Sequence, residues 1–397
     1  MRVAVNALFL HYPHSGIGQY LLRLMSSLGA AYPDDSFWLL VPPGAGAEAS
    51  ELPRFPPNVE AREVPLHTPG GRRFEKFLWE QHVFPHTARQ MGADLLHVPY
   101  FATPLHQPLP TVVTIHDMIP FRLPVYMTSG AVRIYQSLVS RASRRATRII
   151  TVSEYSRQEI QELLGIPKEC IQVVLEAAGE QFRPCDDPQA LAEARQRYGL
   201  EPRYVLYVGG FDERKNVQGL VQAFAHLLAD GADDSALGSA DGGAGVPLQL
   251  MIAGDTSRLG GTTYPDWRPL AQKLGVMERI RTGLVTDADL PLLYSGAAVY
   301  VFPSLYEGFG LNPLEAMACG APVVCSDRTA LPEVVGDAAI LVDPTEPAAI
   351  AAALKRVLRD TGLQAQLRAR GLERAARFSW ERAAHETRAV FHDALAR

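Results

Sequence analysis

The sequence predicts an α/β protein built from two doubly wound, Rossmann-like domains that face each other across a cleft. Three observations carry this prediction. The chain has 397 residues, which is more than one ordinary hydrophobic core accommodates. Short apolar segments of strand length alternate with helical patterns, as they do in parallel sheets that are covered by helices. The order strand, glycine-containing loop, helix and strand opens the chain and occurs again from residue 203.

Composition and charge narrow the class of protein. Hydrophobic residues make up 47% of the chain and charged residues 20%, which is typical of a soluble globular protein. A formal net charge of -5 argues against a general nucleic-acid binder. The four cysteines, Cys170, Cys185, Cys319 and Cys325, form no CxxC motif and fit a reducing compartment. The N-terminal segment lacks a signal-peptide cleavage site and no apolar stretch has the length of a membrane span, so we expect a cytoplasmic protein.

The first domain is expected to cover residues 1–185. Its predicted strands are residues 2–10, 36–41, 94–98, 111–115, 149–152 and 171–174, and its predicted helices are residues 19–31, 77–90 and 131–148. Residues 43–75 are rich in Pro and Gly and are expected to form a surface connection. Gly16 and Gly18 in the first loop lack the third glycine of a dinucleotide fingerprint, so we predict no NAD site. These two glycines either let the backbone approach a ligand or form a tight turn.

Two features of this domain are candidates for function. The strand at residues 111–115 ends in His116, and a titratable side chain at the carboxyl end of such a strand lies where open sheets bind ligands. The helix at residues 131–148 carries five arginines: Arg133, Arg141, Arg144, Arg145 and Arg148. A solvated helix face is the preferred interpretation of these arginines. The alternative is a surface for anionic lipid or an acceptor phosphate, which would place the protein peripherally at the inner face of the membrane.

The second domain is expected to cover residues 186–377. Its predicted strands are residues 203–208, 248–253, 280–283, 298–302 and 339–342, with helices between them. The segment at residues 230–246 consists mostly of small and acidic residues, cannot bury apolar area, and is expected to be disordered. From residue 347 the chain is predicted to be helical, with a break near Ser379.

Residues 302–325, FPSLYEGFGLNPLEAMACGAPVVC, hold the strongest functional signal. Glu307 and Glu315 are separated by seven residues, and a glycine-rich turn follows Glu307. Asn312 is predicted to be a helix N-cap, with Pro313 at the first position and Glu315 three residues after the cap. The N-terminus of this helix would offer N–H groups and a positive dipole to a phosphate. Alternatively, Glu315 is half of a capping box and Glu307 a loop carboxylate, but the two glutamates and the glycines together favour a function.

A second phosphate-binding feature follows the strand at residues 203–208. Two glycines end this strand, and Arg214 and Lys215 stand at the start of the next helix. Adjacent cations fit the charge of a diphosphate, with a surface salt bridge as the alternative. Glu315 is placed for the vicinal hydroxyls of a ribose, and Glu307 for the hydroxyls of a sugar. The sum is a site for a nucleotide diphosphate that carries a polyol, and the sequence shows neither a P-loop nor an aspartate-rich Mg²⁺ cluster.

Several segments resemble the retaining nucleotide-sugar glycosyltransferases of family four, which have the GT-B fold. VFPSLYEGFGLNPLEAMACGAPVVCSD is similar to the C-terminal signature of that family, and GGFDERKN to its diphosphate-binding loop. TIHDMIP and TVSEYS are similar to its N-terminal motifs, and FSWERAA to its closing helix. The resemblance covers nearly the whole chain. It implies an acceptor-side first domain, a donor-binding second domain, and a terminal helix, at about residues 378–397, that crosses back to the first domain.

The resemblance also implies an activity and its site residues. The enzyme would move a hexose from a nucleotide-diphosphate sugar to a glycan or lipid-linked acceptor, without a metal or cofactor. GDP-mannose is the first choice of donor, by similarity to the loops of polysaccharide mannosyltransferases, and UDP-glucose is the next. The implied catalytic residues are His116, Glu307, Lys215 and Arg214. The implied donor-binding residues are Glu315, Gly308, Phe309, Gly310, Leu311, Asn312, Gly209, Gly210, Val285, Gly16 and Gly18.

One position departs from the family pattern, and other functions stay open. Many relatives carry an arginine directly after the first glycine of the diphosphate loop, where this chain has Gly210, and Arg214 is expected to compensate. No nucleophilic carboxylate is evident for the anomeric carbon, so we predict a front-face substitution with retention. A GT-B epimerase or phosphorylase is a second enzyme interpretation. A sugar-nucleotide-binding protein that has lost activity is the non-enzyme interpretation.

Overall fold

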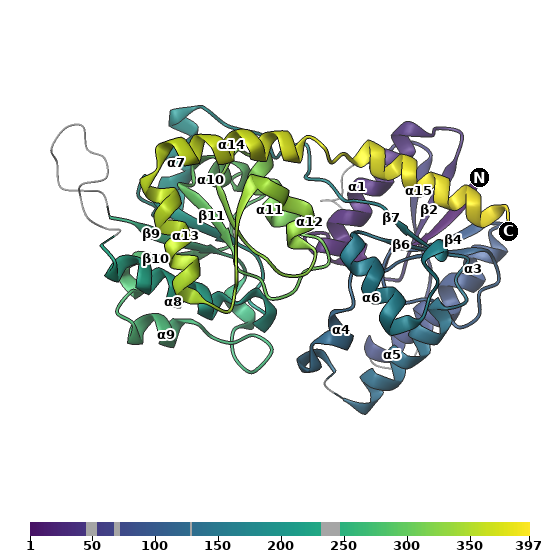
Figure 1. Ribbon diagram of the computed structural model, residues 1–397. Helices are drawn as coiled ribbons and strands as arrows, with labels where there is room; N and C mark the ends of the chain where they lie inside the picture. The colour runs from purple at the N-terminus through teal and green to yellow at the C-terminus, as the bar shows by residue number, and fades with distance from the viewer. Residues whose placement is uncertain (45–53, 67–71, 128, 232–246) are drawn as a thin grey trace. The chain divides into compact units, whose positions relative to one another are not determined.

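The computed structural model describes residues 1–44, 54–66, 72–127, 129–231 and 247–397. They form two compact units (Figure 1): unit 1 is Met1–Glu176 with Ser379–Arg397, and unit 2 is Ala177–Phe378. The chain passes from unit 1 to unit 2 after Glu176, rather than after residue 185. The segment expected to be disordered at residues 230–246 lies, from residue 232 onward, outside the described residues.

Unit 1 contains a seven-stranded parallel sheet in the order β3-β2-β1-β4-β5-β6-β7. Its strands are β1 Arg2–Asn6, β2 Ser36–Val41, β3 Val59–Glu63, β4 Leu95–Val98, β5 Thr111–Thr114, β6 Arg148–Thr151 and β7 Ile171–Val173. Val3 of β1 pairs with Phe37 of β2 on one side and with Leu95 of β4 on the other. The strand order therefore reverses between β1 and β4, which gives unit 1 a topological switch point there.

The edge strand β3 lies within residues 43–75, where the sequence predicted only a surface connection, and that prediction is wrong for Val59–Glu63. Val59 is the one buried residue of this strand, and the others are charged or exposed. An edge strand pairs on one side only and tolerates such a polar sequence. It therefore lacks the apolar pattern that marks interior strands.

Helices flank the sheet of unit 1. They are α1 Gly16–Ala31, α2 Arg72–Leu78, α3 Phe84–Gln90, α4 Ile119–Arg122, α5 Gly130–Ser143, α6 Glu154–Leu164 and α15 Trp380–Leu395, with a π-helical turn at Trp79–Val83. Ser153 caps α6, because its Oγ accepts a hydrogen bond from the N–H of Ser156 at 3.0 Å. The helix expected at residues 131–148 ends at Ser143, and Arg148 begins β6 instead.

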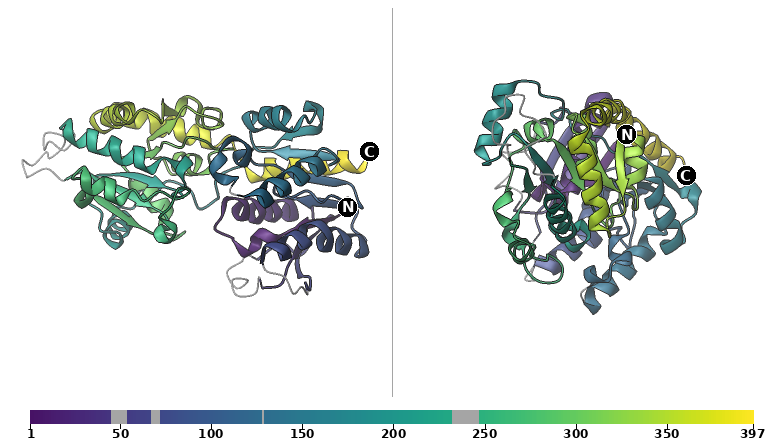
Figure 2. Two further views of the ribbon diagram at one scale, coloured as in Figure 1. Left: turned by 90° about the horizontal axis from the view of Figure 1, so that it is seen from below. Right: turned by 60° about the vertical axis from the view of Figure 1, so that its left-hand side comes forward.

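The C-terminal helix α15 completes the core of unit 1, so both ends of the chain belong to this unit (Figure 2). It packs along α1 and against β5 and β6. Phe391 is fully buried, and its ring centroid lies 5.1 Å from that of His97 on β4. Trp380 contacts Tyr20 of α1, with 6.1 Å between ring centroids. Asp393 forms an ion pair with Arg148 at the start of β6.

Unit 2 contains a six-stranded parallel sheet in the order β10-β9-β8-β11-β12-β13. Its strands are β8 Tyr204–Val208, β9 Gln249–Ala253, β10 Ile280–Gly283, β11 Val299–Phe302, β12 Val323–Ser326 and β13 Ala339–Val342. Its helices are α7 Pro188–Arg197, α8 Val217–Ala229, α9 Arg268–Lys273, α10 Leu290–Gly296, α11 Leu311–Ala318, α12 Leu331–Val335, α13 Pro347–Arg359 and α14 Thr361–Ala375. Counted within the unit this is the order 3-2-1-4-5-6 of a doubly wound nucleotide-binding sheet, with its switch point between β8 and β11.

Candidate functional site

The candidate site lies at the carboxyl ends of β8 and β11, which are neighbours in the sheet of unit 2. The chain leaves β8 through two glycines and reaches the short 3-10 helix Glu213–Lys215. It leaves β11 through residues 303–310 and then enters α11. Because the strand order reverses between these two strands, their loops diverge and leave room for a ligand above the sheet.

A compact ion network joins the two loops. The Nζ of Lys215 donates to Oε1 of Glu307 at 2.6 Å, and Nη1 of Arg214 lies 2.8 Å from Oε2 of the same carboxylate. On its other side, Arg214 Nε lies 2.9 Å from Oδ1 of Asp212. The hydroxyl of Ser304 donates to Glu307 Oε1 at 2.6 Å. The structure therefore brings together three of the four predicted catalytic residues, and it adds Asp212 and Ser304.

Because this network is buried, its charged groups affect one another's pKa values strongly. Glu307 is 9% exposed and Lys215 7% exposed. Burial raises the pKa of Glu307, but the charges of Arg214 and Lys215 outweigh burial and lower that pKa from 4.5 to about 2. Burial and the charge of Arg214 lower the pKa of Lys215, while Glu307 acts in the opposite direction. The carboxylate is thus ionised at every physiological pH, and the two cations are fixed in place before any ligand arrives.

Backbone contacts explain why the two loops hold this geometry. Asn216 adopts a left-handed conformation with φ of 54°, and its side-chain amide donates to the carbonyls of Pro303 at 3.2 Å and Pro344 at 2.6 Å. The carbonyl of Arg214 accepts from the N–H of Leu305 at 2.6 Å. These bonds connect the end of the β8 loop to the start of the β11 loop and thereby set the distance between the cations and the carboxylate.

Helix α11 begins earlier than the sequence predicted. The predicted N-cap at Asn312 is wrong, because Gly310 is the N-cap and Leu311 the first helical residue. Gly310 has φ of 134°, and a Cβ at this position would lie 2.8 Å from Cδ2 of Leu331. Glu315 is then the fifth residue of the helix, outside the first turn, so the alternative of a capping box is not formed. Because the N-cap Gly310 has no side chain, no side-chain cap hydrogen bond comes from that position, and the first N–H groups of α11 can serve another acceptor.

Glu315 lies on α11 and faces α10. It is half-buried, and the hydroxyl of Tyr294 donates to its Oε2 at 3.3 Å. The other predicted donor-binding residues, which lie between the two glutamates, differ in burial. Gly308, Phe309 and Gly310 are buried, whereas Leu311 and Asn312 are half-buried.

Glycines end the three strands on the other side of the switch point. The N–H of Gly209 donates to the carbonyl of Ala253 at 3.1 Å, and that of Gly254 to the carbonyl of Gly283 at 3.0 Å. A Cβ at Gly254 would lie 2.4 Å from the carbonyl oxygen of Gly209, so only glycine allows these strand ends to approach. Val285 follows β10 and is half-buried.

His116 follows β5 in unit 1, and both of its ring nitrogens have partners there. Nδ1 lies 3.1 Å from Oε1 of Glu176, and Nε2 lies 3.0 Å from the carbonyl oxygen of Pro99. Burial lowers the pKa of His116, but the hydrogen bond and charge of Glu176 outweigh burial and raise the pKa above 6.5. Two acceptors, one of them charged, favour the doubly protonated ring. The T-shaped contact with Tyr20, with 4.7 Å between centroids, fixes the ring plane.

Glu176→Gln is expected to lower the pKa of His116 and to change how stability depends on pH. Because the folded-state pKa is raised, the stabilisation from His116 is fully present below about pH 6.5 and is lost as pH rises through the folded-state pKa. The variant should lose less stability over that range than the unaltered protein, which shares every other titratable group. NMR titration of the His116 ring, with chemical denaturation at several pH values, measures both effects. An unchanged ring titration would contradict the assignment to Glu176.

The other predicted residues of unit 1 differ in their surroundings. Gly16 is the first residue of α1, and a Cβ there would meet no atom within 4 Å among the described residues. Gly18 lies in the first turn of α1, and a Cβ there would lie 2.2 Å from the carbonyl oxygen of Tyr12, so glycine lets the start of this helix pack against the preceding loop. Arg148 is buried in its ion pair with Asp393 and does not belong to an exposed basic face, which corrects its place in the predicted surface.

Sequence reasoning missed the polar residues that hold the ion network. Asp212 and Ser304 make contact with Arg214 and Glu307, and Oγ1 of Thr329 accepts from the N–H of Glu307 at 2.9 Å. Asp212 and Ser304 stand two and three residues before their partners in the sequence, which is a signal that could have been used. Thr329 is distant in sequence, and its positive φ of 55° is visible only in the structure.

Comparison with known proteins adds independent evidence. Residues 14–175 match the model of the family described as Glycosyltransferase Family 4, and residues 191–374 match that of Glycosyl transferases group 1. The chain is 34% identical to the O-antigen chain mannosyltransferase B of Escherichia coli, over 95% of each protein. It is 30% identical to the serotype-specific mannosyltransferase WbdA of Escherichia coli, over 70% of this chain and 33% of WbdA.

Solved structures with the same fold confirm the predicted GT-B architecture. The sucrose-phosphate synthase of Thermosynechococcus elongatus superposes with a TM-score of 0.75 at 22% identity, over 100% of this chain and 99% of that one. WaaG, a glycosyltransferase involved in lipopolysaccharide biosynthesis, superposes with a TM-score of 0.71 at 17% identity, over 98% of both chains. These identities support the fold alone. The family models and the full-length relative go further, and the chain is a glycosyltransferase that belongs to family four.

Proposed function

We propose that this chain is a retaining mannosyltransferase of polysaccharide synthesis, which takes its sugar from a nucleoside-diphosphate donor. The observation that carries the proposal is the meeting of Arg214, Lys215 and Glu307 at the switch point of unit 2. Family membership implies a nucleotide-sugar donor and a glycan acceptor. Mannose is supported by the names of two relatives, the O-antigen chain mannosyltransferase B and WbdA. We assign donor binding to unit 2, with the acceptor served by unit 1.

Each donor group is assigned to a part of the candidate site. Arg214 and Lys215 bind the diphosphate, and Arg214 takes the place of the arginine that is absent at Gly210. The N-terminus of α11, with Phe309 to Asn312 around it, binds phosphate and sugar. Glu307 accepts hydrogen bonds from sugar hydroxyls and Glu315 from the ribose. The base lies by Val285, and Gly209 lets the backbone approach the diphosphate.

The proposed reaction is a substitution on one face of the sugar. The bond between the anomeric carbon and the phosphate oxygen breaks, and a bond to the acceptor oxygen forms on the same face. The acceptor hydroxyl gives its proton to an oxygen of the departing diphosphate. Arg214 and Lys215 stabilise the negative charge that builds on this leaving group, and because Glu307 already holds them they need little reorganisation. His116 can bind a hydroxyl only by exchanging its bond to Glu176 or to Pro99.

Donor binding and product stereochemistry test the proposal. In a thermal-shift series with GDP-, UDP-, ADP- and dTDP-sugars, GDP-mannose is expected to raise Tm most, because binding to the folded state stabilises it. NMR of the product should show that the anomeric configuration of the donor is kept. An inverted linkage would overturn the front-face mechanism, and preference for UDP-glucose would overturn the assignment of mannose. Donor hydrolysis without acceptor separates an active transferase from a binding protein that has lost activity.

The proposed acceptor involves lipid in two ways, as a carrier of the glycan and as a membrane surface. We propose that the acceptor is a glycan, free or lipid-linked, and that α5 makes peripheral contact with an anionic membrane surface. Arg133, Arg141, Arg144 and Arg145 are exposed on α5 or directly after it, and α5 contains no acidic residue. None of the described helices has the length and apolar character needed to cross a bilayer.

A further inference from the structure

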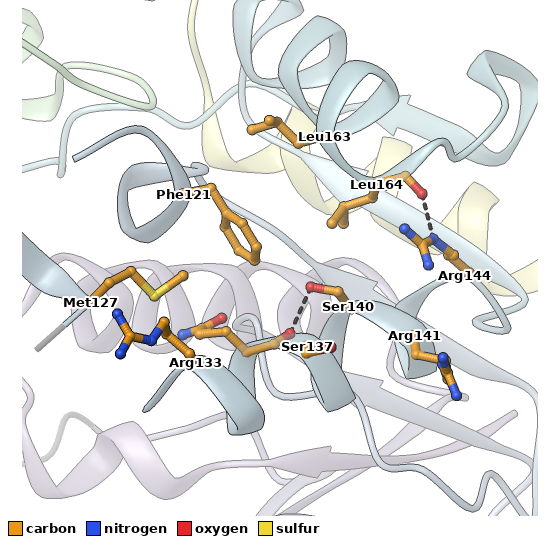
Figure 3. A pocket seen from close by; sticks show the side chains of 10 residues that line it. Phe121, Met127, Arg133, Ser137, Ser140, Arg141, Arg144, Leu163 and Leu164 are labelled. Atoms are coloured by element: carbon orange, nitrogen blue, oxygen red, sulfur yellow. Dashed lines mark hydrogen bonds between the residues drawn. The ribbon is translucent and has the colours of Figure 1, made fainter. Parts of the chain in front are cut away.

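A pocket of about 250 Å³ lies in unit 1 beside α5 (Figure 3). Its walls come from α5, from the segment that includes α4, and from the C-terminal end of α6. The lining residues are Phe121, Met127, Arg133, Gln136, Ser137, Ser140, Arg141, Arg144, Leu163 and Leu164. The six that come from α5 and its C-cap recur at helical spacing, so one face of this helix forms a whole wall.

All the charged residues that line this pocket are positive. Arg133, Arg141 and Arg144 line it, and none of the three forms an ion pair within the described part of the chain. Nearby, the guanidinium of Arg122 is neutralised by Glu159 at 2.6 Å and Glu162 at 2.5 Å. Figure 3 shows Arg141 and Arg144 towards one end of the pocket and Arg133 at the other. Arg141 and Arg144 are one helical turn apart, and two guanidinium groups without a carboxylate complement an anion with several acceptor oxygens, such as a phosphate.

The side of the pocket across from α5 is apolar. Figure 3 shows Phe121, Leu163 and Leu164 on that side, and Met127 beside Arg133. Nε of Arg144 donates to the carbonyl of Leu164 at 2.6 Å, which fixes the guanidinium at the C-terminus of α6. A ligand for this site is therefore anionic at one end and apolar next to it.

We propose that this pocket binds the phosphate head group of an anionic lipid, with the first carbons of the lipid against the apolar side of Phe121, Leu163 and Leu164. The volume is slightly below the ~300 Å³ at which pockets for small ligands begin, so the site holds a head group rather than a whole lipid. This proposal rests on the proposed function, because it adds a lipid-binding site to unit 1, the unit assigned to the acceptor. It differs from attraction by a basic surface, because it gives the lining residues a role that neighbouring residues outside the pocket lack.

Neighbouring residues on the same helix provide matched controls. Arg145 is exposed and adjacent to Arg144 but does not line the pocket, and Ile134 is 65% exposed beside Arg133 and does not line it either. Co-sedimentation with phosphatidylcholine vesicles, with and without phosphatidylglycerol, measures binding by the full-length protein. Arg141→Lys keeps the charge but loses the planar fork, and we expect it to weaken binding at least ~tenfold, while Arg145→Lys changes binding less than ~twofold. Phe121→Ser should weaken binding more than Ile134→Ser does.

Each possible result of these experiments tests one part of the proposal. Equal losses for Arg141→Lys and Arg145→Lys, or no loss for either, would overturn the pocket and leave only diffuse attraction to the surface. Competition by inorganic phosphate or glycerol phosphate as effective as that by vesicles would overturn the lipid and assign the site to a soluble phosphate. Thermal melting of each variant shows whether it is folded, and Gln in place of Arg141 provides a second variant if Lys is not. Donor hydrolysis by the unaltered protein, measured without vesicles, tests the proposed function separately.

Discussion

Glu307→Gln is expected to abolish measurable sugar transfer and to lower the free energy of unfolding by about 3–5 kcal/mol, the cost of breaking a buried ion pair. The carboxylate is 9% exposed and neutralises both Lys215 and Arg214. An amide fills the same space but leaves Lys215 without its charge partner, while Arg214 keeps Asp212. Urea denaturation measures the stability, and a radiolabelled-sugar assay measures transfer.

A double-mutant cycle separates the ion pair from the packing around it. Lys215→Met removes the buried cation, so the double variant Glu307→Gln, Lys215→Met should lose less stability than the sum of the single changes. The expected coupling is about 1–3 kcal/mol, within the range measured for residues in contact. Additive losses would contradict a coupled pair.

The same network predicts how stability depends on acid. The folded-state pKa of Glu307, about 2, is below its ordinary value of 4.5. Its contribution is therefore fully present above about pH 4.5 and is lost as pH falls towards 2, with a total of about 3 kcal/mol. Glu307→Gln should show a flatter loss of stability in that interval than the unaltered protein. Parallel curves would mean that Glu307 does not titrate there.

The sequence predicted the fold because the interior strands of both sheets are short, continuous apolar runs between glycine-containing loops. Residues 111–115 and 203–208 are examples, and they form the buried strands β5 and β8. The sequence did not predict elements whose position depends on contacts with distant segments rather than on their own hydrophobic pattern. β3 is an edge strand with charged side chains, and its only signal is its partner β2. The end of α5 at Ser143 was missed for a similar reason, because Arg148 is an arginine that is buried by its pairing with Asp393.

The sequence predicted which residues belong to the candidate site, but it did not predict how they contact one another. Charge and spacing selected Arg214, Lys215 and Glu307 from loops that lie far apart in sequence. Their mutual neutralisation depends on the adjacency of β8 and β11, which a single sequence does not state. The start of α11 was misplaced because Asn-Pro is a strong capping signal, whereas Gly310 at φ of 134° ends the loop two residues earlier. The backbone conformation of a glycine is set by the space around it.

Glu315→Ala is expected to raise the KM for the donor about tenfold to hundredfold with a smaller effect on kcat. Hydrogen bonds from ribose hydroxyls to a carboxylate contribute about 1.5–3 kcal/mol of binding, and they are made equally in the ground and transition states. A capping box would instead predict a loss of about 1 kcal/mol of stability with KM unchanged. The structure disfavours that alternative, since Glu315 is the fifth residue of α11.

Tyr294→Phe is the matched control for this prediction. Its hydroxyl donates to Glu315 Oε2 at 3.3 Å, so the variant removes this one hydrogen bond to Glu315 but keeps the carboxylate. Tyr294 is fully buried and its ring stays in the core, so this variant should change stability slightly and the donor KM less than threefold, or about 0.7 kcal/mol. Steady-state kinetics over a range of donor concentrations, with thermal melting of both variants, gives the comparison. If Glu315→Ala matched Tyr294→Phe in KM and in melting, Glu315 would be a structural partner of Tyr294, and the ribose would have to be bound elsewhere in unit 2.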